Sequence, residues 1–164
     1  MIARNKLIVV RRYIANEIDN LNKVQNEISV FSPTIGEEPS SVEIRASASM
    51  LVDFYKGVEK IFEKIARNID QQLPKGEFWH SELLRQMSQE FGSARPPIVT
   101  QALSKRLDEY LRFRHLARNV YGFHLQWERI KPLLVSFDDV FTEFSKCVTE
   151  FLNFLDNLIS ATQK

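Results

Sequence analysis

Apolar residues recur along most of this chain at intervals of three and four positions, the period of a helix that buries one face. The first such stretch covers roughly residues 2–30 and predicts a long amphipathic helix. A connection rich in turn-forming residues follows, with Pro33, Gly36 and Pro39. The apolar positions of the first stretch are Leu7, Val10, Ile14, Ile18, Leu21, Val24 and Ile28.

A second helix should begin at a capping signal. Ser40 is followed three residues later by Glu43, and this spacing predicts a capping box, in which each side chain caps the other residue's backbone. The apolar pattern then continues until Pro74 stops it. A shorter helix carrying Trp79 comes next, and we expect Gly92 at its C-cap.

Two further helices complete the expected chain. The first follows Pro97 and should run to about Gly122, and the second should begin near Pro132, which suits a first-turn position. Apolar positions from Phe137 to Leu158 alternate steps of four and three, as in a long seam between helices. The sequence therefore predicts an all-α fold: an antiparallel helical bundle of four longer helices and one short helix, as a single domain over residues 1–164.

Composition supports a folded protein of the cytoplasm. Hydrophobic residues make up 44% and charged residues 26%, as in ordinary globular proteins. The single cysteine, Cys147, cannot form an intramolecular disulfide, which fits a reducing compartment. The apolar run over residues 7–10 is too short for a signal peptide, and no stretch approaches the ~20 apolar residues that span a bilayer. We therefore expect a soluble, cytoplasmic protein that does not contact a membrane.

Charge is distributed unevenly along the chain. The net charge is only +1, so no global signature of nucleic-acid binding is present. Between Lys105 and Lys131, however, seven Lys or Arg residues accompany three acidic residues. The segment from Pro132 to Lys164 has five acidic residues and two lysines. This pattern indicates a local anion site beside an acidic helix.

The residues best suited to chemistry gather at the end of the fourth predicted helix. The Arg118 guanidinium can match two phosphate oxygens and stabilise the charge that develops on them. The His124 imidazole can take the proton of an RNA 2′-hydroxyl or return one to the leaving oxygen. Asn119 can hold an oxygen or orient the histidine. Because the sequence lacks HxxxH, HExxH and paired-cysteine spacings, we expect no metal and no cofactor.

The spacing of these residues sets a geometric condition. On a continuous helix, His124 would lie about 120° round the axis from Arg118, so the two would not converge. Gly122 could end the helix and let His124 turn back, or a second copy of the chain across a two-fold axis could supply it. Arg114 and Tyr121 share the helical face of Arg118 and are candidate substrate-binding residues.

Structural roles remain open for several of these residues. Arg118 could form a surface ion pair with Asp108 or Glu128. His124 could be an ordinary polar residue at a helix end. Arg114 is expected to position other groups or to face solvent, rather than to be catalytic.

Two other polar residues are given structural roles. Trp79 and His80 together are expected to form a packing anchor under the short helix, because a tryptophan contributes a large buried area. Glu59, on the second helix, is expected on a solvated helix face, although it could reach the cleft.

Several stretches resemble a known family. Arg118-Asn119, followed by four residues and then His124, resembles the motif of the HEPN superfamily. The segment from Arg114 to Phe123 resembles the HepT-like ribonuclease-toxin branch of that superfamily. The resemblance covers roughly residues 45–160 and extends to residues 54–59, 73–80 and 106–111.

The resemblance implies a function and partners. It implies a homodimer with a cleft along its two-fold axis and a metal-independent endoribonuclease that acts on RNA as the toxin of a toxin-antitoxin pair. The implied antitoxin resembles a minimal nucleotidyltransferase, which in related pairs modifies a tyrosine two positions after the motif histidine. Gln126 occupies that position here, and Tyr121 is only a distant substitute. The alternative is a non-catalytic helical dimer that binds a nucleotidyltransferase partner or RNA.

Overall fold

The computed structural model describes residues 2–163, and this part of the chain is helical with no β-strand. The prediction of an all-α chain with four longer helices and one short helix is confirmed for these residues. None of their helices has the length and apolar character needed to cross a membrane. The α-helices are α1 (Arg4–Phe31), α2 (Ser41–Ile65), α3 (Trp79–Met87), α4 (Gln101–Asn119) and α5 (Trp127–Ala161), and three short helical segments are η1 (Ser32–Thr34), η2 (Ala66–Asp70) and η3 (Gly122–His124).

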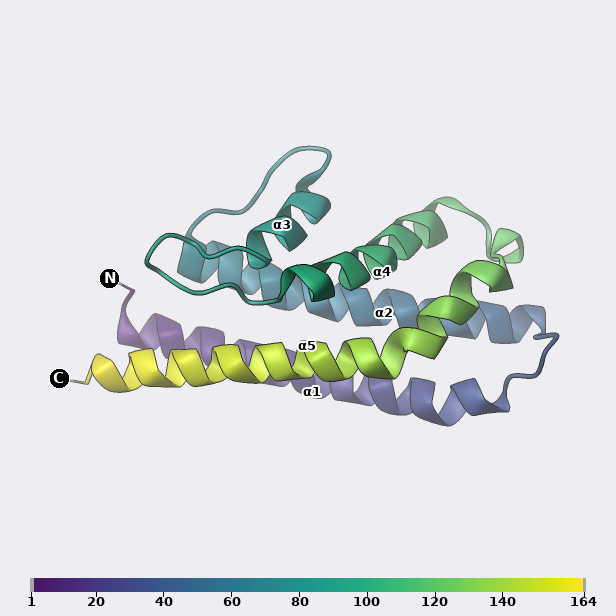
Figure 1. Cartoon of the computed structure of the whole chain (residues 1–164), viewed down its shortest axis with the longest axis horizontal. Coiled ribbons are helices and arrows are strands. Elements are labelled where there is room, and N and C mark those ends of the chain that lie inside the picture. Colours follow the sequence, from purple (N-terminus) through teal and green to yellow (C-terminus); the bar gives the residue numbers. More distant parts are fainter. Residues whose placement is uncertain (1, 164) are drawn as a thin grey trace.

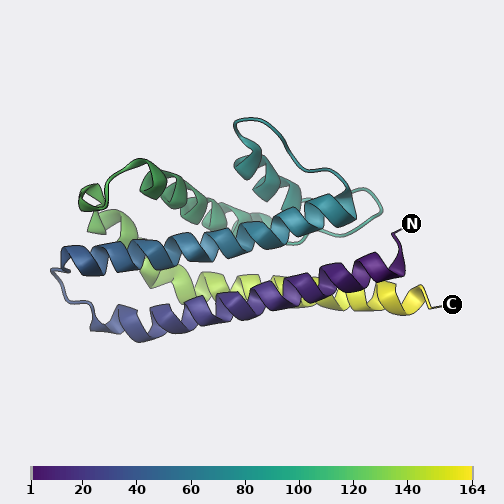
Figure 2. The same ribbon diagram turned by 180° about the vertical axis from the view of Figure 1, so that it is seen from behind.

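The α2 helix is the central element, because it contacts each of the other four α-helices. Figures 1 and 2 show α1, α2 and α5 side by side along the long axis, with α3 and α4 on one side of them. The start of α1 and the end of α5 lie at one end of the molecule, and η3 lies at the other (Figure 1). The η3 segment also contacts α2. The functional candidates near Arg118 therefore lie away from the termini.

The start of α2 is fixed by the predicted capping box. The Ser40 Oγ accepts a hydrogen bond from the Glu43 backbone N–H at 3.1 Å, and the Glu43 carboxylate accepts one from the Ser40 N–H at 2.9 Å. Such a cap stabilises a helix by about 1 kcal/mol. The other end departs from the sequence pattern, since α2 passes after Ile65 into η2, and η2 is followed by Gln71, whose φ of 56° ends the helical segment.

Two further helix ends and one helix start differ from the predictions. The α3 helix ends at Met87 rather than at Gly92, which lies beyond it with a φ of 52°. The α4 helix ends at Asn119 instead of Gly122. The α5 helix begins at Trp127, so Pro132 lies inside it rather than in its first turn. A proline inside a helix removes one backbone hydrogen bond and bends the axis, and α5 changes direction in its N-terminal part (Figure 1).

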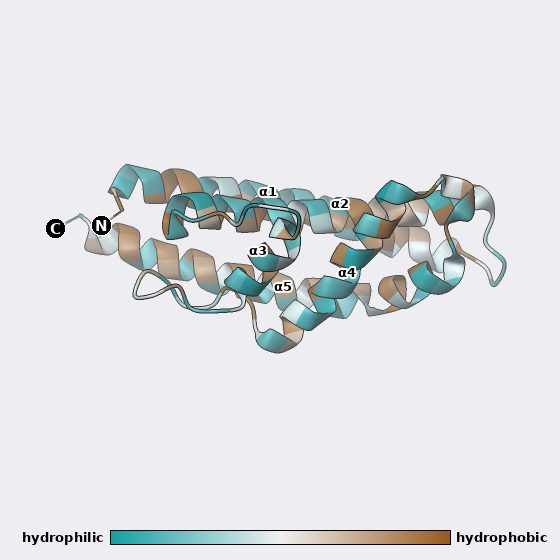
Figure 3. Cartoon of the chain, turned by 90° about the horizontal axis from the view of Figure 1, so that it is seen from above, coloured by the Kyte–Doolittle hydropathy of each residue, from teal (hydrophilic) through white to brown (hydrophobic). Residues whose placement is uncertain are grey.

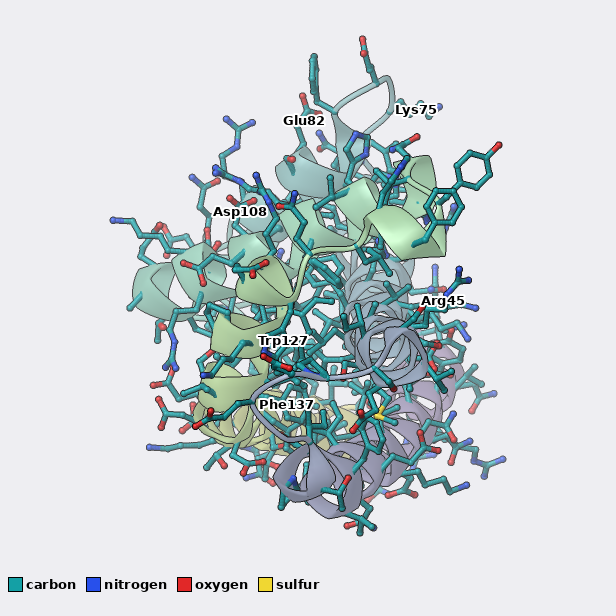
Figure 4. All side chains as sticks on the ribbon, turned by 90° about the vertical axis from the view of Figure 1, so that its right-hand side faces the viewer. Arg45, Lys75, Glu82, Asp108, Trp127 and Phe137 are labelled. Carbon is teal, nitrogen blue, oxygen red and sulfur yellow. The ribbon has the colours of Figure 1, made fainter. Side chains whose placement is uncertain are left out.

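The core joins three helices through aromatic side chains. Phe54 of α2 packs edge-on against Tyr110 of α4, with ring centroids 5.3 Å apart, and against Phe137 of α5, at 5.0 Å. Figure 4 shows Phe137 directed inward among the helices. Hydrophobic and hydrophilic positions alternate around each helix in Figure 3, as amphipathic helices require. This core holds α4 in place and so positions the residues at its C-terminal end.

Candidate functional site

The C-terminal end of α4 is closed by Asn119. Its Nδ2 donates a hydrogen bond of 2.8 Å to the backbone carbonyl of His115, which satisfies one of the carbonyls left unpaired at a helix end. Val120 then adopts an extended conformation and ends the helix. In this arrangement the Asn119 amide caps α4.

The chain turns again in η3, which carries His124. The His124 N–H donates to the Tyr121 carbonyl at 2.8 Å, while its imidazole lies on the exposed surface. Gly122 lies against α2, since a Cβ at this position would lie 2.5 Å from guanidinium atoms of Arg45, the end of an exposed and flexible side chain. Figure 4 shows Arg45 extending outward from α2. The helix is interrupted between Arg118 and His124, as predicted, but the interruption begins at Val120, before Gly122.

Two aromatic side chains flank His124 on the surface. Tyr121 is 73% exposed and Phe123 is 66% exposed. Their rings stack with centroids 5.3 Å apart and planes 10° apart, and the Phe123 ring lies 4.6 Å from the His124 ring. We call Tyr121, Phe123 and His124 the aromatic patch. Exposed aromatic faces of this kind can stack on the bases of single-stranded RNA.

Arg118 lies on the exposed surface near the end of α4. Within residues 2–163 its guanidinium makes no ion pair, so the alternative of a surface pair with Asp108 or Glu128 is not found. Asp108 instead pairs with Arg112 at 2.8 Å. The Arg118 guanidinium therefore has its donors available for an anionic ligand.

Arg114, one helical turn before Arg118, has a different environment. Its side chain is only 2% exposed, so the expectation that it could face solvent is wrong. The Nη2 atom donates to both carboxylate oxygens of Glu59, at 3.0 and 2.9 Å, and the guanidinium lies 5.0 Å from the centre of the Tyr55 ring. Its predicted substrate-binding role stays a prediction, while its observed contacts hold α4 to α2.

Glu59 and His80 form the remainder of this buried cluster. The Nδ1 atom of His80 lies 2.7 Å from the Glu59 carboxylate and 3.0 Å from the Arg114 guanidinium. The expectation of a solvated Glu59 is wrong, because only 7% of this residue is exposed. Trp79 packs partly buried against the core, as predicted, but His80 forms part of a charged cluster rather than an anchor. We call these three residues the Glu59–His80–Arg114 cluster.

One sequence signal could have indicated this cluster. Glu59 follows Tyr55 by four positions and precedes Phe62 by three, so it lies on the same helical face as two buried aromatic residues. A carboxylate in the core is costly unless it is paired with a cation. The position of Glu59 therefore called for a buried basic partner, although nothing local indicates which one.

A pocket between α3 and α4 contains both predicted and missed residues. It has a volume of about 360 Å³ and is lined by Phe78 and His80 on one side and by Arg114, His115 and Arg118 on the other. His124 is not among its lining residues. We call this the α3–α4 pocket. Within one protomer it places Arg118 with His80, whereas the aromatic patch lies beyond the end of α4.

The part of the chain that the structure describes contains no group of three or more His, Cys, Asp or Glu side chains that could hold a metal ion.

Comparison with known proteins identifies the family. Residues 46–155 match the family described as HepT-like protein. The chain belongs to the HepT-like family. The match begins in α2 and ends in α5, so this HepT-like protein carries both the Glu59–His80–Arg114 cluster and the segment from Arg118 to His124 within its family region. The resemblance to the HepT-like branch of the HEPN superfamily is thereby confirmed. Neither a curated protein nor a solved structure matches the chain.

Proposed function

We propose that this HepT-like protein is a metal-independent endoribonuclease of the cytoplasm, which acts as the toxin of a toxin-antitoxin pair. The observation that carries this proposal is the exposed placement of Arg118 and His124 at one end of the molecule. The chain belongs to the HepT-like family, and the spacing of Arg118, Asn119 and His124 resembles the HEPN motif. An exposed guanidinium can bind a phosphodiester, and an exposed imidazole can move a proton.

The proposed reaction is a transesterification within the RNA. The 2′-hydroxyl oxygen forms a bond to phosphorus, and the bond from phosphorus to the 5′-oxygen of the next nucleotide breaks. His124 transfers a proton, either from the 2′-hydroxyl or to the 5′-oxygen, while Arg118 stabilises the charge on the phosphate oxygens. The products carry a 2′,3′-cyclic phosphate and a 5′-hydroxyl. No metal ion enters these steps.

We further propose that the protein acts as a two-fold dimer of one-domain helical bundles, with the η3 segments of both protomers at the shared cleft. Val120 is extended, and it separates the element that carries Arg118 from the one that carries His124. A second copy would add another arginine and another imidazole to the same cleft. The exposed rings of Tyr121 and Phe123 offer apolar surface for such a contact.

The alternative function is a non-catalytic dimer that holds RNA or a nucleotidyltransferase-like partner. The exposed stack of Tyr121 on Phe123 favours this alternative, because aromatic stacking supports binding without catalysis. Tyr121 is also accessible to a modifying partner, whereas Gln126 at the start of α5 lacks a phenolic hydroxyl.

The deciding experiment is an RNA cleavage assay in EDTA with purified protein and a 5′-labelled single-stranded RNA. We expect the wild type to cleave, and we expect Arg118→Ala and His124→Ala each to lower the rate by about 10²–10⁴-fold without loss of dimerisation. Arg12→Ala is a matched control, because Arg12 is an exposed arginine on α1. Equal cleavage by wild type and His124→Ala would contradict the proposal. RNA binding without cleavage by the wild type would favour the alternative.

A further inference from the structure

We propose that His80 is a second catalytic imidazole, which contacts the same RNA phosphodiester as Arg118 in the α3–α4 pocket, with Glu59 as its positioning residue. The inference rests on the proposed ribonuclease function, and it extends that function to a residue outside the Arg118–His124 motif. Its basis is the geometry of the Glu59–His80–Arg114 cluster and the residues that line the pocket.

The His80 ring is held in one orientation. Its Nδ1 lies 2.7 Å from the Glu59 carboxylate and 3.0 Å from Nη2 of Arg114, so both partners in the cluster contact the same ring nitrogen. The ring also lies against Trp79, with centroids 3.8 Å apart. Nε2 is consequently the ring nitrogen left for a ligand, and the side chain remains 30% exposed. A carboxylate that fixes the tautomer and direction of a histidine is a common feature of catalytic sites.

Arg114 compensates the negative charge of the buried Glu59 carboxylate. A buried carboxylate beside a histidine would be costly without a full positive charge, and the Arg114 guanidinium binds both oxygens of Glu59. Because Arg114 neutralises Glu59, it is not available as the main phosphate-binding group. Arg118, on the same wall of the pocket, supplies the unpaired guanidinium.

The pocket has suitable dimensions and surroundings for part of an RNA strand. Its volume of about 360 Å³ lies within the range of roughly 300–1,000 Å³ found for small-molecule sites. Arg118 can bind the phosphate, and the ring of Phe78, which is 68% exposed, can stack on a base. The pocket therefore combines a phosphate-binding group, a stacking surface and an oriented imidazole.

The chemistry gives this imidazole a defined task. Transesterification removes a proton from the 2′-hydroxyl and delivers a proton to the departing 5′-oxygen, and two separate groups can perform these transfers. His80 is assigned to one of these transfers. His124 does not line the pocket of its own protomer, so the other transfer is assigned to the His124 that the second protomer of the proposed dimer brings to the shared cleft. The bond from the 2′-oxygen to phosphorus forms as the bond from phosphorus to the 5′-oxygen breaks, so no oxidant, reductant or metal is consumed.

The test uses NMR of the three histidine imidazoles in the full-length protein. Their Cε1–H resonances are assigned with His80→Gln, His115→Gln and His124→Gln, and an uncleavable 2′-O-methyl oligoribonucleotide is then titrated in. We expect the His80 resonance to shift on binding, and we expect this shift to be lost in Arg118→Ala. A purely structural His80 would not respond to RNA in this way.

Cleavage kinetics supply the second measurement. His80→Gln retains an N–H donor for Glu59 and should fold, yet kcat should fall by about 10²-fold or more while KM changes little. Glu59→Gln should lower kcat through loss of ring orientation. Glu82→Gln is the control on the same helix, because Glu82 is exposed and lies outside the α3–α4 pocket.

The outcomes separate this inference from the proposed function. If RNA shifts the His124 resonance but not that of His80, and His80→Gln cleaves like the wild type, the inference is overturned while the ribonuclease proposal stands. If no histidine resonance moves and the wild type does not cleave, both fail. A shift of His80 together with loss of kcat supports the inference.

Discussion

Arg114 and Glu59 form a buried ion pair between α4 and α2, with Nη2 of Arg114 2.9 Å from Oε2 of Glu59. The two side chains are only 2% and 9% exposed. Arg118 lies one helical turn beyond Arg114 on the same face of α4. This pair therefore anchors the helix that presents Arg118, and it also binds the histidine at the wall of the α3–α4 pocket.

Removing Arg114 should destabilise the protein strongly. Arg114→Ala leaves Glu59 as a buried carboxylate without its guanidinium, and we expect the free energy of unfolding to fall by about 3–5 kcal/mol. Urea denaturation measures this change. Arg112→Ala is the control, because Arg112 is 81% exposed and its pair with Asp108 should contribute less than about 1 kcal/mol. If Arg114→Ala and Arg112→Ala lowered the free energy of unfolding equally, the Arg114–Glu59 pair would not act as a buried ion pair.

A glycine at the crossing of α1 and α2 should be intolerant of substitution. A Cβ on Gly57 would collide with the side chain of Leu21, which is only 1% exposed and cannot move into solvent. We expect Gly57→Ala to lower the free energy of unfolding by about 1–3 kcal/mol, the usual cost of overpacking a core. Gly36→Ala should have little effect, because nothing lies within 4 Å of a Cβ there. Similar midpoints in urea for both variants would show that α1 and α2 are packed more loosely.

Tyr110 should make stability depend on alkaline pH. Burial raises the pKa of its phenol from 10.0 to about 12, against the opposing effect of the hydrogen bond with Ser136. The folded state thus favours the neutral phenol, whose O–H donates to the Leu133 carbonyl at 2.8 Å. This stabilisation is complete below pH about 10 and is lost as the pH rises toward about 12, with a total of about 2–3 kcal/mol.

The comparison of wild type with Tyr110→Phe isolates this contribution. At pH 8 the variant should be less stable by about 0.5–1.5 kcal/mol, because the Leu133 carbonyl loses a donor. Between pH 10 and 12 its free energy of unfolding should fall less steeply than that of the wild type. Parallel curves over this range, measured by urea denaturation, would rule out a raised pKa at Tyr110.

Local signals in the sequence predicted most of the helices. The capping box at Ser40 fixes the start of α2, and the apolar spacing of the first segment corresponds to α1. The start of α5 was misplaced because Pro132 favours a first turn locally. Ile130, which is fully buried, lies upstream of that proline, and its packing extends the helix back to Trp127.

The end of α3 depends on contacts that no local pattern contains. The Met87 carbonyl accepts hydrogen bonds from the backbone N–H groups of Ile98 and Val99, at 2.8 and 3.2 Å. These residues are brought back to α3 by the loop that carries Gly92. Gly92 therefore led to a predicted C-cap beyond the true end of α3. The helix ends earlier, at Met87, because the carbonyl of Met87 bonds to Ile98 and Val99.

The two parts of the candidate site differ in how far the sequence could reveal them. Arg118 and His124 lie six positions apart, so their residue types and spacing could be read directly. Glu59 and His80 are 21 positions apart, and Glu59 and Arg114 are 55 apart. Their association depends on how α2, α3 and α4 pack. The helical spacing of Glu59 from core residues indicates that Glu59 is buried. Its partners, His80 and Arg114, can be identified only from the fold.

The account requires two copies of the Arg118–His124 segment to meet, and the separation of spin labels in solution tests this most directly. In a Cys147→Ser background, one label is placed at Val42→Cys in the first turn of α2 and, in a separate sample, at Val9→Cys on α1. Both residues are exposed and lie outside the aromatic patch. The start of α2 lies at the end of the molecule that carries η3, and the start of α1 lies at the other end (Figure 1). Double electron–electron resonance should find a dimer in which the two labels at position 42 are closer together than the two at position 9. A monomer, or a dimer in which the labels at position 42 are the more distant pair, would contradict the account.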